Sequence, residues 1–266
     1  MRRRAPFTPR PLWRVALAAH GAAGGAVIVS PRVWPWALGV CVGSHAAVVA
    51  AGLLPRCTWM GPNIRSLSAA AEQRGELALT FDDGPDPQIT PRVLDLLDNA
   101  NAKGTFFVIG RRAEEHPELV REITVRGHAV ENHSYTHPVS FYFRSPAALR
   151  REIEPVQSVL QQLCGRAPRF FRAPAGIRSP LLQRELERCE LQLVSWTRRG
   201  YDAIEWRHEK VLARLLPSVS PGAILVLHDG GLRRHADAAV LTVLPSLLAR
   251  MRERSLRSVT LLAGQQ

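Results

Sequence analysis

The chain has 266 residues, 46% of them hydrophobic, which suits one sizeable domain with an appendage and excludes wholesale disorder. Its net charge of +12 comes almost entirely from arginine, because Lys103 and Lys210 are the only lysines. The arginines are scattered rather than clustered with aromatic side chains, which argues against nucleic-acid binding. Solvated faces account for most of them, and an anionic membrane surface or a phosphate-bearing substrate is the other interpretation.

Residues 1–56 differ in composition from the rest and are expected to form an N-terminal membrane anchor. Two apolar runs, about 15–29 and 33–54, flank the turn Ser30-Pro31-Arg32, and the second is long enough to cross a bilayer. The tryptophans near the ends of the second run are placed as interfacial anchors: Trp34, Trp36 and Trp59. We favour a two-helix transmembrane hairpin over a single signal-anchor helix. A cleaved signal peptide ranks last, because no clean cleavage site follows.

Arginines flank the two runs unequally, with five before the first run, one between the runs and three after the second. They are Arg2, Arg3, Arg4, Arg10 and Arg14, then Arg32, then Arg56, Arg65 and Arg74. The positive-inside rule places both ends of the hairpin in the cytoplasm, with a periplasmic domain as the alternative. The four cysteines form no CxxC pair and no disulfide framework, which favours a reducing compartment.

After a linker at 57–75, residues 76–266 are predicted to form a domain of repeated β/α units. Strands are expected at 76–81, 105–109, 128–132, 169–172, 191–196, 223–228 and 258–262. Helices are expected at 91–97, with Thr90 as N-cap, and at 117–126, 147–163, 181–189, 209–216 and 236–252. Strands that alternate with helices indicate a parallel sheet. We therefore predict an α/β fold, a distorted seven-stranded (β/α) TIM-like barrel preceded by the helical hairpin.

Two adjacent carboxylates, Asp82 and Asp83, follow the first predicted strand. Neighbouring residues on a strand point in opposite directions, so the Gly84-Pro85 turn must bring both carboxylates to one site. An ordinary Asp-Gly-Pro turn is the structural alternative.

Two histidines, His133 and His137, follow the third predicted strand and lie in a loop or single turn before Pro138. By themselves they are typical of polar surface residues. Together with a carboxylate they make a three-ligand divalent-metal site with room for water. Zn²⁺ is the first expectation, and Co²⁺, Ni²⁺ or Fe²⁺ fit the same ligands. The second carboxylate is then free to act as a base on that water.

Three further segments place reactive side chains at predicted strand ends, where parallel barrels have their active sites. Arg172 ends the fourth strand and could orient a carboxylate, while the Pro174-Ala175-Gly176 turn could present an N–H to an oxyanion. His228 ends a buried strand and is a candidate general acid, which Asp202 could keep protonated. A surface Arg, a turn-capping Asp and a core His are the structural alternatives.

Taken together, these segments resemble the NodB-type polysaccharide deacetylases, carbohydrate esterase family four. The resemblance covers residues 76–266 and rests on 80–85 (TFDDGP), 133–137 (HSYTH), 172–176 (RAPAG), Asp202 and 225–228 (LVLH). It implies a deformed β/α barrel, the NodB homology fold. With the apolar hairpin, we expect a membrane-anchored bacterial member of this family, located in the inner membrane.

The resemblance also implies a role for each residue of these motifs. Asp82 is the implied general base and His228 the general acid, with Arg172 and Asp202 orienting them. Asp83, His133 and His137 are the implied metal ligands. A metal-bound water would attack an N-acyl carbonyl, the Ala175 N–H would help to hold the oxyanion, and acetate or formate would leave a free amino sugar.

The chain departs from the family pattern around the sugar. The family often has Tyr in place of Ala175, and Trp directly after the residue equivalent to Asp202, where this chain has Ala203 and only later Trp206. Pro174, Trp206 and Leu227 are also expected to shape the substrate pocket, Leu227 on its acyl side. The expected partner is an N-acylated amino-sugar glycan, or a lipid-linked sugar if the domain faces the cytoplasm. An O-deacetylase and a non-catalytic carbohydrate-binding relative are the alternatives.

Overall fold

The computed structural model describes residues 11–230 and 237–266. Four of the arginines that precede the first apolar run, Arg2, Arg3, Arg4 and Arg10, lie outside the described residues. So does Ala236, where the last helix is expected to start. The helices are α1 Pro11–Val29, α2 Trp34–Leu53, α3 Ala69–Gln73, α4 Thr90–Asn99, α5 Gly110–Glu115, α6 Pro117–Val125, α7 Pro146–Cys164, α8 Leu182–Arg188, α9 His208–Leu215, α10 Asp237–Glu253 and α11 Leu261–Gly264. The strands are β1 Glu76–Asp82, β2 Gly104–Val108, β3 Ala129–Asn132, β4 Phe170–Phe171, β5 Gln192–Leu193, β6 Arg198–Arg199, β7 Ile224–His228 and β8 Arg257–Ser258.

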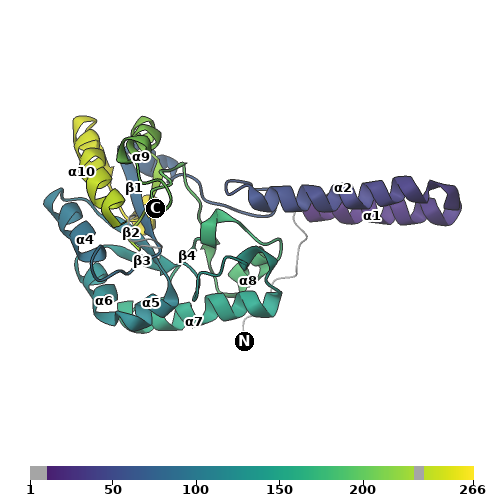
Figure 1. Ribbon diagram of the computed structural model, residues 1–266, viewed down its shortest axis with the longest axis horizontal. Coiled ribbons are helices and arrows are strands. Elements are labelled where there is room, and N and C mark those ends of the chain that lie inside the picture. The colour runs from purple at the N-terminus through teal and green to yellow at the C-terminus, as the bar shows by residue number, and fades with distance from the viewer. Residues whose placement is uncertain (1–10, 231–236) are drawn as a thin grey trace.

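The strands form one parallel sheet with helices packed outside it (Figure 1). Within the described residues, its order is β5-β4-β3-β2-β1-β7-β6, and β8 pairs beside the start of β1. Every strand pairing is parallel, which confirms the predicted β/α architecture. The register places Asp82 of β1 opposite Phe107 of β2 and His228 of β7, so their side chains meet at the carboxyl end of the sheet.

The barrel is distorted because one bent stretch, residues 192–199, serves both ends of the sheet. Its first part, β5, pairs with β4, and its last part, β6, pairs with β7. The single strand predicted at 191–196 is therefore split in two. The strand predicted at 258–262 is wrong beyond Ser258, because Thr260 caps a new helix: its hydroxyl accepts a hydrogen bond from Ala263 N.

Alternation along the central strands decides which side chains enter the barrel. In β1, Leu77, Leu79 and Phe81 pack into the large core beneath the helices, and Ala78 belongs to the smaller core inside the barrel. Because strand side chains alternate, Thr80 and Asp82 share the inner face with Ala78. The same parity in β7 puts His228 on the inner face with Val226, which packs in the inner core.

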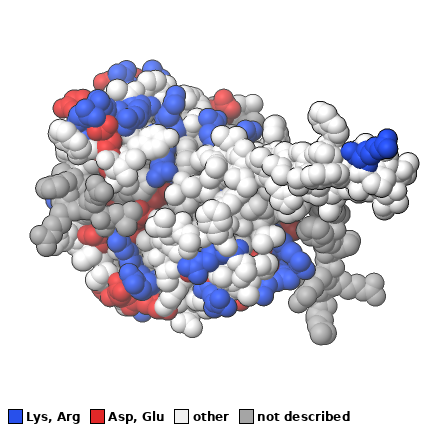
Figure 2. Space-filling model, turned by 45° about the vertical axis from the view of Figure 1, so that its right-hand side comes forward, with Lys and Arg blue, Asp and Glu red and all other residues white. Residues whose placement is uncertain are grey.

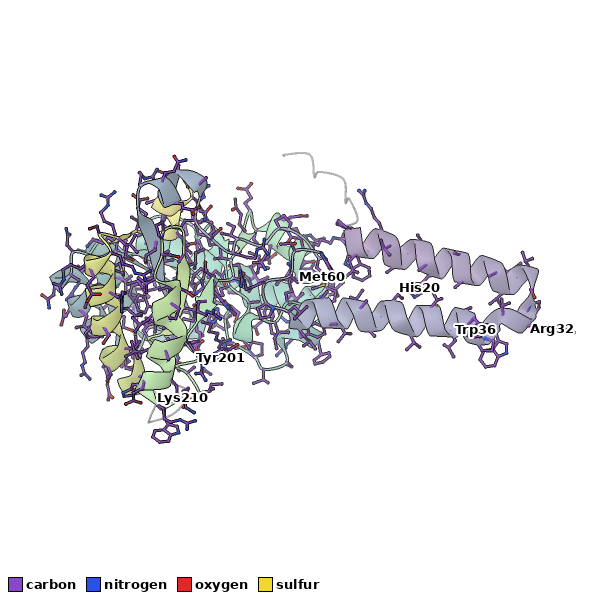
Figure 3. The ribbon with its side chains drawn as sticks, turned by 90° about the horizontal axis from the view of Figure 1, so that it is seen from above. His20, Arg32, Trp36, Met60, Tyr201 and Lys210 are labelled. Carbon is purple, nitrogen blue, oxygen red and sulfur yellow. The ribbon has the colours of Figure 1, made fainter. Side chains whose placement is uncertain are left out.

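Helices α1 and α2 form an antiparallel hairpin that projects from the domain (Figures 1 and 3). They are long and apolar enough to cross a membrane, with 19 and 20 residues and a mean hydropathy of 1.4 for α1 and 1.7 for the span Pro31–Leu53. On the face shown in Figure 2 the hairpin is uncharged except near its far end. Figure 3 places Arg32 at that tip with Trp36 beside it, and the rings of His20 and His45 meet between the helices, 5.1 Å apart.

The root of the hairpin is joined to the domain by backbone contacts rather than by a loose tether. Arg178, 1% exposed, donates to the carbonyl oxygens of Cys57 and Met60, and its own N–H donates to the Gly52 carbonyl. Further along, Ile64 forms a parallel bridge with Val194 at the end of β5. The residues that follow α2 therefore take part in the barrel wall.

Candidate active site

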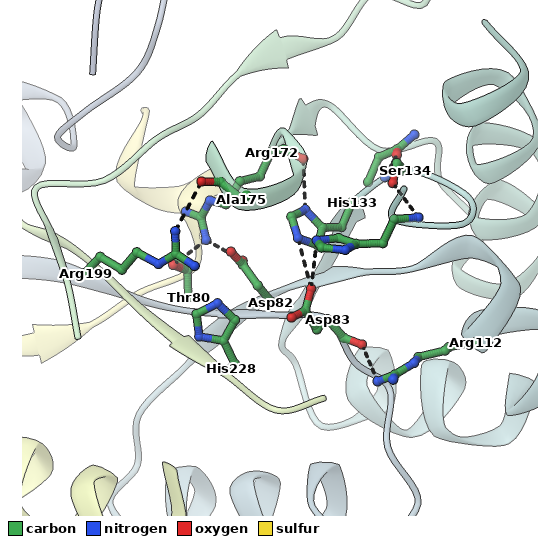
Figure 4. Close-up of polar contacts among 12 residues, drawn as sticks. Thr80, Asp82, Asp83, Arg112, His133, Ser134, Arg172, Ala175, Arg199 and His228 are labelled. Carbon is green, nitrogen blue, oxygen red and sulfur yellow. Dashed lines mark hydrogen bonds and ion pairs between the residues drawn. The ribbon is translucent and has the colours of Figure 1, made fainter. Parts of the chain in front are cut away.

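The candidate residues gather at the carboxyl ends of the central strands (Figure 4). Asp82 and His228 end β1 and β7, while His133 and Arg172 directly follow β3 and β4. Each strand delivers one or two polar side chains to the same end of the barrel. Residues far apart in the sequence thus meet because their strands are parallel and in register.

The turn after β1 separates the two aspartates into different environments. Asp82 closes the strand on the inner face, and Asp83 adopts a left-handed backbone with φ 72°. The peptide bond Gly84–Pro85 that follows is cis. Arg112 Nη1 donates to the Asp83 carbonyl at 2.7 Å, and Asp229 N donates to the Asp82 carbonyl at 3.1 Å. These backbone contacts fix the turn, so both carboxylates reach the site from adjacent positions.

The loop after β3 is held by side-chain bonds that its own sequence supplies. Asn132 Oδ1 accepts from Ser134 N, and Ser134 Oγ accepts from His137 N. Glu152 of α7 accepts hydrogen bonds from the backbone of Tyr135 and Thr136. These hydrogen bonds bend the loop so that the imidazoles of His133 and His137 both face Asp83. The centroids of the two rings lie 4.9 Å apart.

Asp83, His133 and His137 have the arrangement of a metal-binding triad. The Nε2 atom of each histidine lies 3.3 Å from Asp83 Oδ1, and the candidate ligand atoms of all three residues lie within 4.8 Å of one another. His133 Nδ1 donates to the Arg172 carbonyl at 2.8 Å, which leaves its Nε2 lone pair directed at Asp83.

The electrostatics of the triad fit a cation. Asp83 Oδ1 is buried and accepts no hydrogen bond within the described chain. Burial by itself would raise the pKa of Asp83, but the three site histidines, His133 first, outweigh it and hold the pKa below its usual range. Burial and the neighbouring His133 lower the pKa of His137 to about 4, so its imidazole is neutral near pH 7. A buried carboxylate that faces two imidazole nitrogens is a donor set that a divalent metal satisfies.

Arg172 is fully buried and contacts the other aspartate. Its Nη1 donates to Asp82 Oδ1 at 2.6 Å and to Thr80 Oγ1 at 2.8 Å, while Nη2 donates to the Ser195 carbonyl at 3.1 Å. The guanidinium lies 4.0 Å from the centroid of the Phe107 ring. Burial lowers the pKa of Arg172, although the Asp82 carboxylate opposes the shift. Asp82 is thus held as an oriented carboxylate beside the triad.

His228 is paired with Asp202 through both its ring and its backbone. Asp202 Oδ1 lies 2.8 Å from His228 Nδ1, and Oδ2 accepts from His228 N at 2.8 Å. Burial opposes protonation, but the Asp202 carboxylate, with Asp83 and Asp82 behind it, raises the pKa of His228 to about 9. The imidazole is therefore a protonated acid at neutral pH.

The four residues expected to shape the substrate pocket are placed differently from one another. Pro174 is buried, and Ala175 is exposed with a left-handed backbone, φ 54°. Leu227 is not brought into the site, because it lies on the outer face of β7 and packs in the core beneath the helices. Trp206 is 69% exposed and its ring contacts the neighbouring Arg207, so the described contacts do not place it at the site.

Sequence reasoning missed residues whose roles come from contacts. Val226, two residues before His228, lies on the inner face of β7, where Leu227 is expected. Strand alternation, counted back from His228, predicts Val226 on that face. Asp229 is fully buried and accepts from Thr90 Oγ1 at 2.6 Å, which places Thr90 against the site rather than as the expected N-cap of α4. Burial raises the pKa of Asp229 to about 7. Arg199 Nη1 donates to the Ala175 carbonyl, a contact that no local sequence pattern predicts.

Comparison with known proteins identifies the family. A family model described as polysaccharide deacetylase matches residues 69–194. A chitooligosaccharide deacetylase of Azorhizobium caulinodans is 35% identical over 195 residues, which cover 67% of this chain and 91% of the relative. A peptidoglycan-N-acetylglucosamine deacetylase of Bacillus cereus is 32% identical over 197 residues, covering 71% of this chain and 67% of the relative.

Solved structures show the same fold. A peptidoglycan N-acetylglucosamine deacetylase superposes with a TM-score of 0.69 at 29% identity, covering 76% of this chain and 92% of that one. A family 4 acetyl xylan esterase of Clostridium thermocellum, solved with a cobalt ion, gives a TM-score of 0.62 at 34% identity, covering 71% of this chain and 89% of that one. Both matches cover most of the solved chain, so this chain and the two solved proteins share the barrel fold.

Proposed function

Because the chain belongs to the polysaccharide deacetylase family, we propose that it removes an N-acyl group, acetyl or formyl, from an amino sugar. The observation that carries this proposal is the meeting of three units at one end of the barrel. They are the Asp82–Arg172 pair, the Asp83–His133–His137 triad and the His228–Asp202 pair. A base, a metal-binding set and an acid are the groups that hydrolysis of an amide requires.

Asp82 is the proposed general base. Arg172 holds its carboxylate in place, where it accepts a proton from the attacking water. Its neighbour Asp83 is turned toward the histidines and is left to bind the metal, so the two aspartates divide the work between them.

Asp83, His133 and His137 are the proposed ligands of one divalent metal, Zn²⁺ first, with Co²⁺, Ni²⁺ or Fe²⁺ fitting the same donors. The bound metal supplies Lewis acidity, which acidifies water and polarises the acyl carbonyl. The Arg172 carbonyl fixes the tautomer of His133, so that Nε2 is available as a ligand atom.

His228 is the proposed general acid. Asp202 keeps its imidazole protonated, and the proton passes to the amine as the bond between nitrogen and the acyl carbon breaks. The Ala175 N–H, on an exposed turn that Arg199 holds by its carbonyl, is the proposed donor to the oxyanion. The products are a carboxylate and a free amino sugar.

We place the protein at the bacterial inner membrane, with α1–α2 as a multi-pass anchor and the catalytic domain, residues 76–266, in the cytoplasm. Helices of 19 and 20 residues are each about 30 Å long at about 1.5 Å per residue, which matches the apolar core of a bilayer. The alternative is a periplasmic domain, for which peptidoglycan would be the first substrate to test.

An O-deacetylase is the second candidate, because the same groups cleave esters and one relative of known structure is called an acetyl xylan esterase. Purified full-length protein in detergent, assayed on an N-acetylated chitooligosaccharide and on acetylated xylan, separates the two. We expect acetate release from the amide substrate, with a kcat/KM above that for the ester. The reverse order would favour the esterase.

The proposal is tested by Asp82→Asn. We expect kcat to fall by about 10²–10⁴-fold, the usual contribution of a general base, while the metal content of the purified protein stays unchanged. The matched variant Asp83→Asn should lose both activity and metal. A variant Asp82→Asn with wild-type turnover would contradict the assigned mechanism.

A further inference from the structure

A cavity of about 710 Å³ lies where the hairpin meets the domain. We call it the junction groove. It is lined by Leu54, Pro55, Arg56, Cys57, Thr58, Trp59, Arg65, Trp196, Thr197, Arg198, Arg199, Tyr201 and Arg214. Its wall combines the segment that leaves α2 with the bent stretch that closes the barrel. This volume is that of an ordinary small-molecule site.

The junction groove is strongly basic. Five arginines line it, and none of the described residues that form its wall is acidic. Arg56 and Arg65 are exposed and form no ion pair with a described carboxylate, and Arg199 Nε is buried without a hydrogen-bond partner. Arg214 is partly engaged, through the Gly200 carbonyl and a 3.5 Å contact with Glu205. Unpaired guanidinium groups around a cavity favour a phosphate group, which they bind in a bidentate manner.

The junction groove lies at the end of the apolar hairpin. Residues 54–59 follow α2 directly, and Trp59 is 63% exposed there, as an aromatic residue at a membrane interface would be. Figure 3 shows the opposite end of the hairpin, with Arg32 and Trp36, far from Met60 and Tyr201. If the hairpin spans a bilayer, the groove is at the level of the lipid headgroups.

The junction groove also adjoins the catalytic residues. Arg199, part of its wall, donates to the carbonyl of Ala175, and Figure 4 shows it beside Arg172 and Thr80. Trp196 lines the groove as well, and a Cβ placed on Gly176 would collide with its ring. A sugar attached to a phosphate in the groove would therefore lie beside the Ala175 turn, on the side of the site where Arg172 and Thr80 lie.

We propose that the junction groove binds the phosphate of a membrane-embedded lipid that carries the N-acylated amino sugar. The hairpin places the groove at the headgroup level, the arginines hold the phosphate, and the sugar reaches the active site while its lipid stays in the bilayer. This inference rests on the proposed function and adds the lipid phosphate to its substrate.

The test compares Arg56→Gln/Arg65→Gln with wild-type protein in detergent micelles. The matched control is Arg92→Gln/Arg121→Gln, which removes two exposed arginines of α4 and α6. The substrates are a polyprenyl-diphosphate-linked N-acetylglucosamine and a soluble N-acetylated chitotetraose. We expect the groove variant to lose about 10–100-fold in kcat/KM on the lipid-linked substrate, mainly through KM, and to keep its activity on the soluble one. The control should match wild type on both.

Binding is measured separately by tryptophan fluorescence, because Trp59 and Trp196 line the groove. Polyprenyl diphosphate should bind wild-type protein and bind the groove variant about 10–100-fold more weakly. Equal behaviour of variant and wild type would overturn the inference. So would inorganic phosphate or phosphatidylglycerol binding as tightly, which would indicate a free-phosphate or unselective headgroup site. If wild-type protein binds polyprenyl diphosphate but hydrolyses neither substrate, the proposed function is refuted while the lipid-phosphate site remains.

Discussion

Asp82 and Asp83 are identical and adjacent, yet their surroundings assign them different chemistry. Strand β1 ends between them, so Asp82 points into the barrel at Arg172, while the left-handed backbone of Asp83 turns its carboxylate toward two histidines. A carboxylate that a guanidinium orients is positioned to act as a base, and one whose buried oxygen accepts no hydrogen bond in the described chain is suited to bind a cation. The backbone change at one residue thus separates the proposed base from the proposed metal ligand.

Asp202 gives the site a testable pH dependence. The pKa of His228 is about 9, so the acid is protonated below that pH and kcat/KM should decline as pH rises through it. In Asp202→Asn the lowering effect of burial is no longer opposed by this carboxylate, so the pKa falls. We expect the alkaline limb of kcat/KM to move down by about 1 pH unit or more. An unchanged limb would show that another group titrates there.

Gly84 is required by the close approach of Asp229. A Cβ on Gly84 would collide with the Asp229 carboxyl group, so Gly84→Ala should lower the free energy of unfolding by about 1–3 kcal/mol. Asp229→Ala removes the obstacle but takes away the acceptor of the Thr90 hydroxyl hydrogen, while Thr90 Oγ1 still accepts from Asp86 N. In the double variant the losses should be less than additive by about 1 kcal/mol, measured by thermal unfolding. Strict additivity would show that the collision is relieved elsewhere.

Among the elements, the bent stretch 192–199 and the hairpin root have structural roles that their local sequences do not indicate. Residues 192–199 close the barrel only because their two halves face different strands, which no local periodicity records. The hairpin root depends on Arg178, which lies fourteen positions before β5 begins and outside every catalytic motif. Both features join parts of the chain that are distant in sequence.

Arg178 should hold the hairpin on the domain. Its guanidinium donates to three carbonyls of the segment after α2, those of Cys57, Met60 and Gly61. We expect Arg178→Ala to cost about 3 kcal/mol of stability and to expose residues 57–61 to limited proteolysis. Arg178→Lys keeps the charge but not the planar fork, and should be intermediate. Protection equal to wild type in the alanine variant would mean that other contacts hold the root.

At the scale of the whole molecule, the proposed membrane anchor leads to a prediction about the compartment of the domain. The described part of the hairpin has Arg14 near its base and Arg32 at its tip, and the further arginines of the first ten residues precede the base. We expect a fluorescent protein fused after Gln266 to be fluorescent and a phosphatase fused there to be inactive, since both ends should be cytoplasmic. The opposite result would place the domain outside and make peptidoglycan the first substrate to test.

The sequence by itself determined the alternating β/α pattern, the apolar hairpin segments and the family, because periodicity and short motifs are local properties. Asp82, Asp83, His133, His137, Arg172 and His228 all lie at predicted strand ends, and parallel strands bring such ends together. The tertiary structure alone decided the rest. Barrel closure by 192–199, the outward side of Leu227, the exposure of Trp206 and the junction groove depend on contacts between distant segments, which local patterns do not encode.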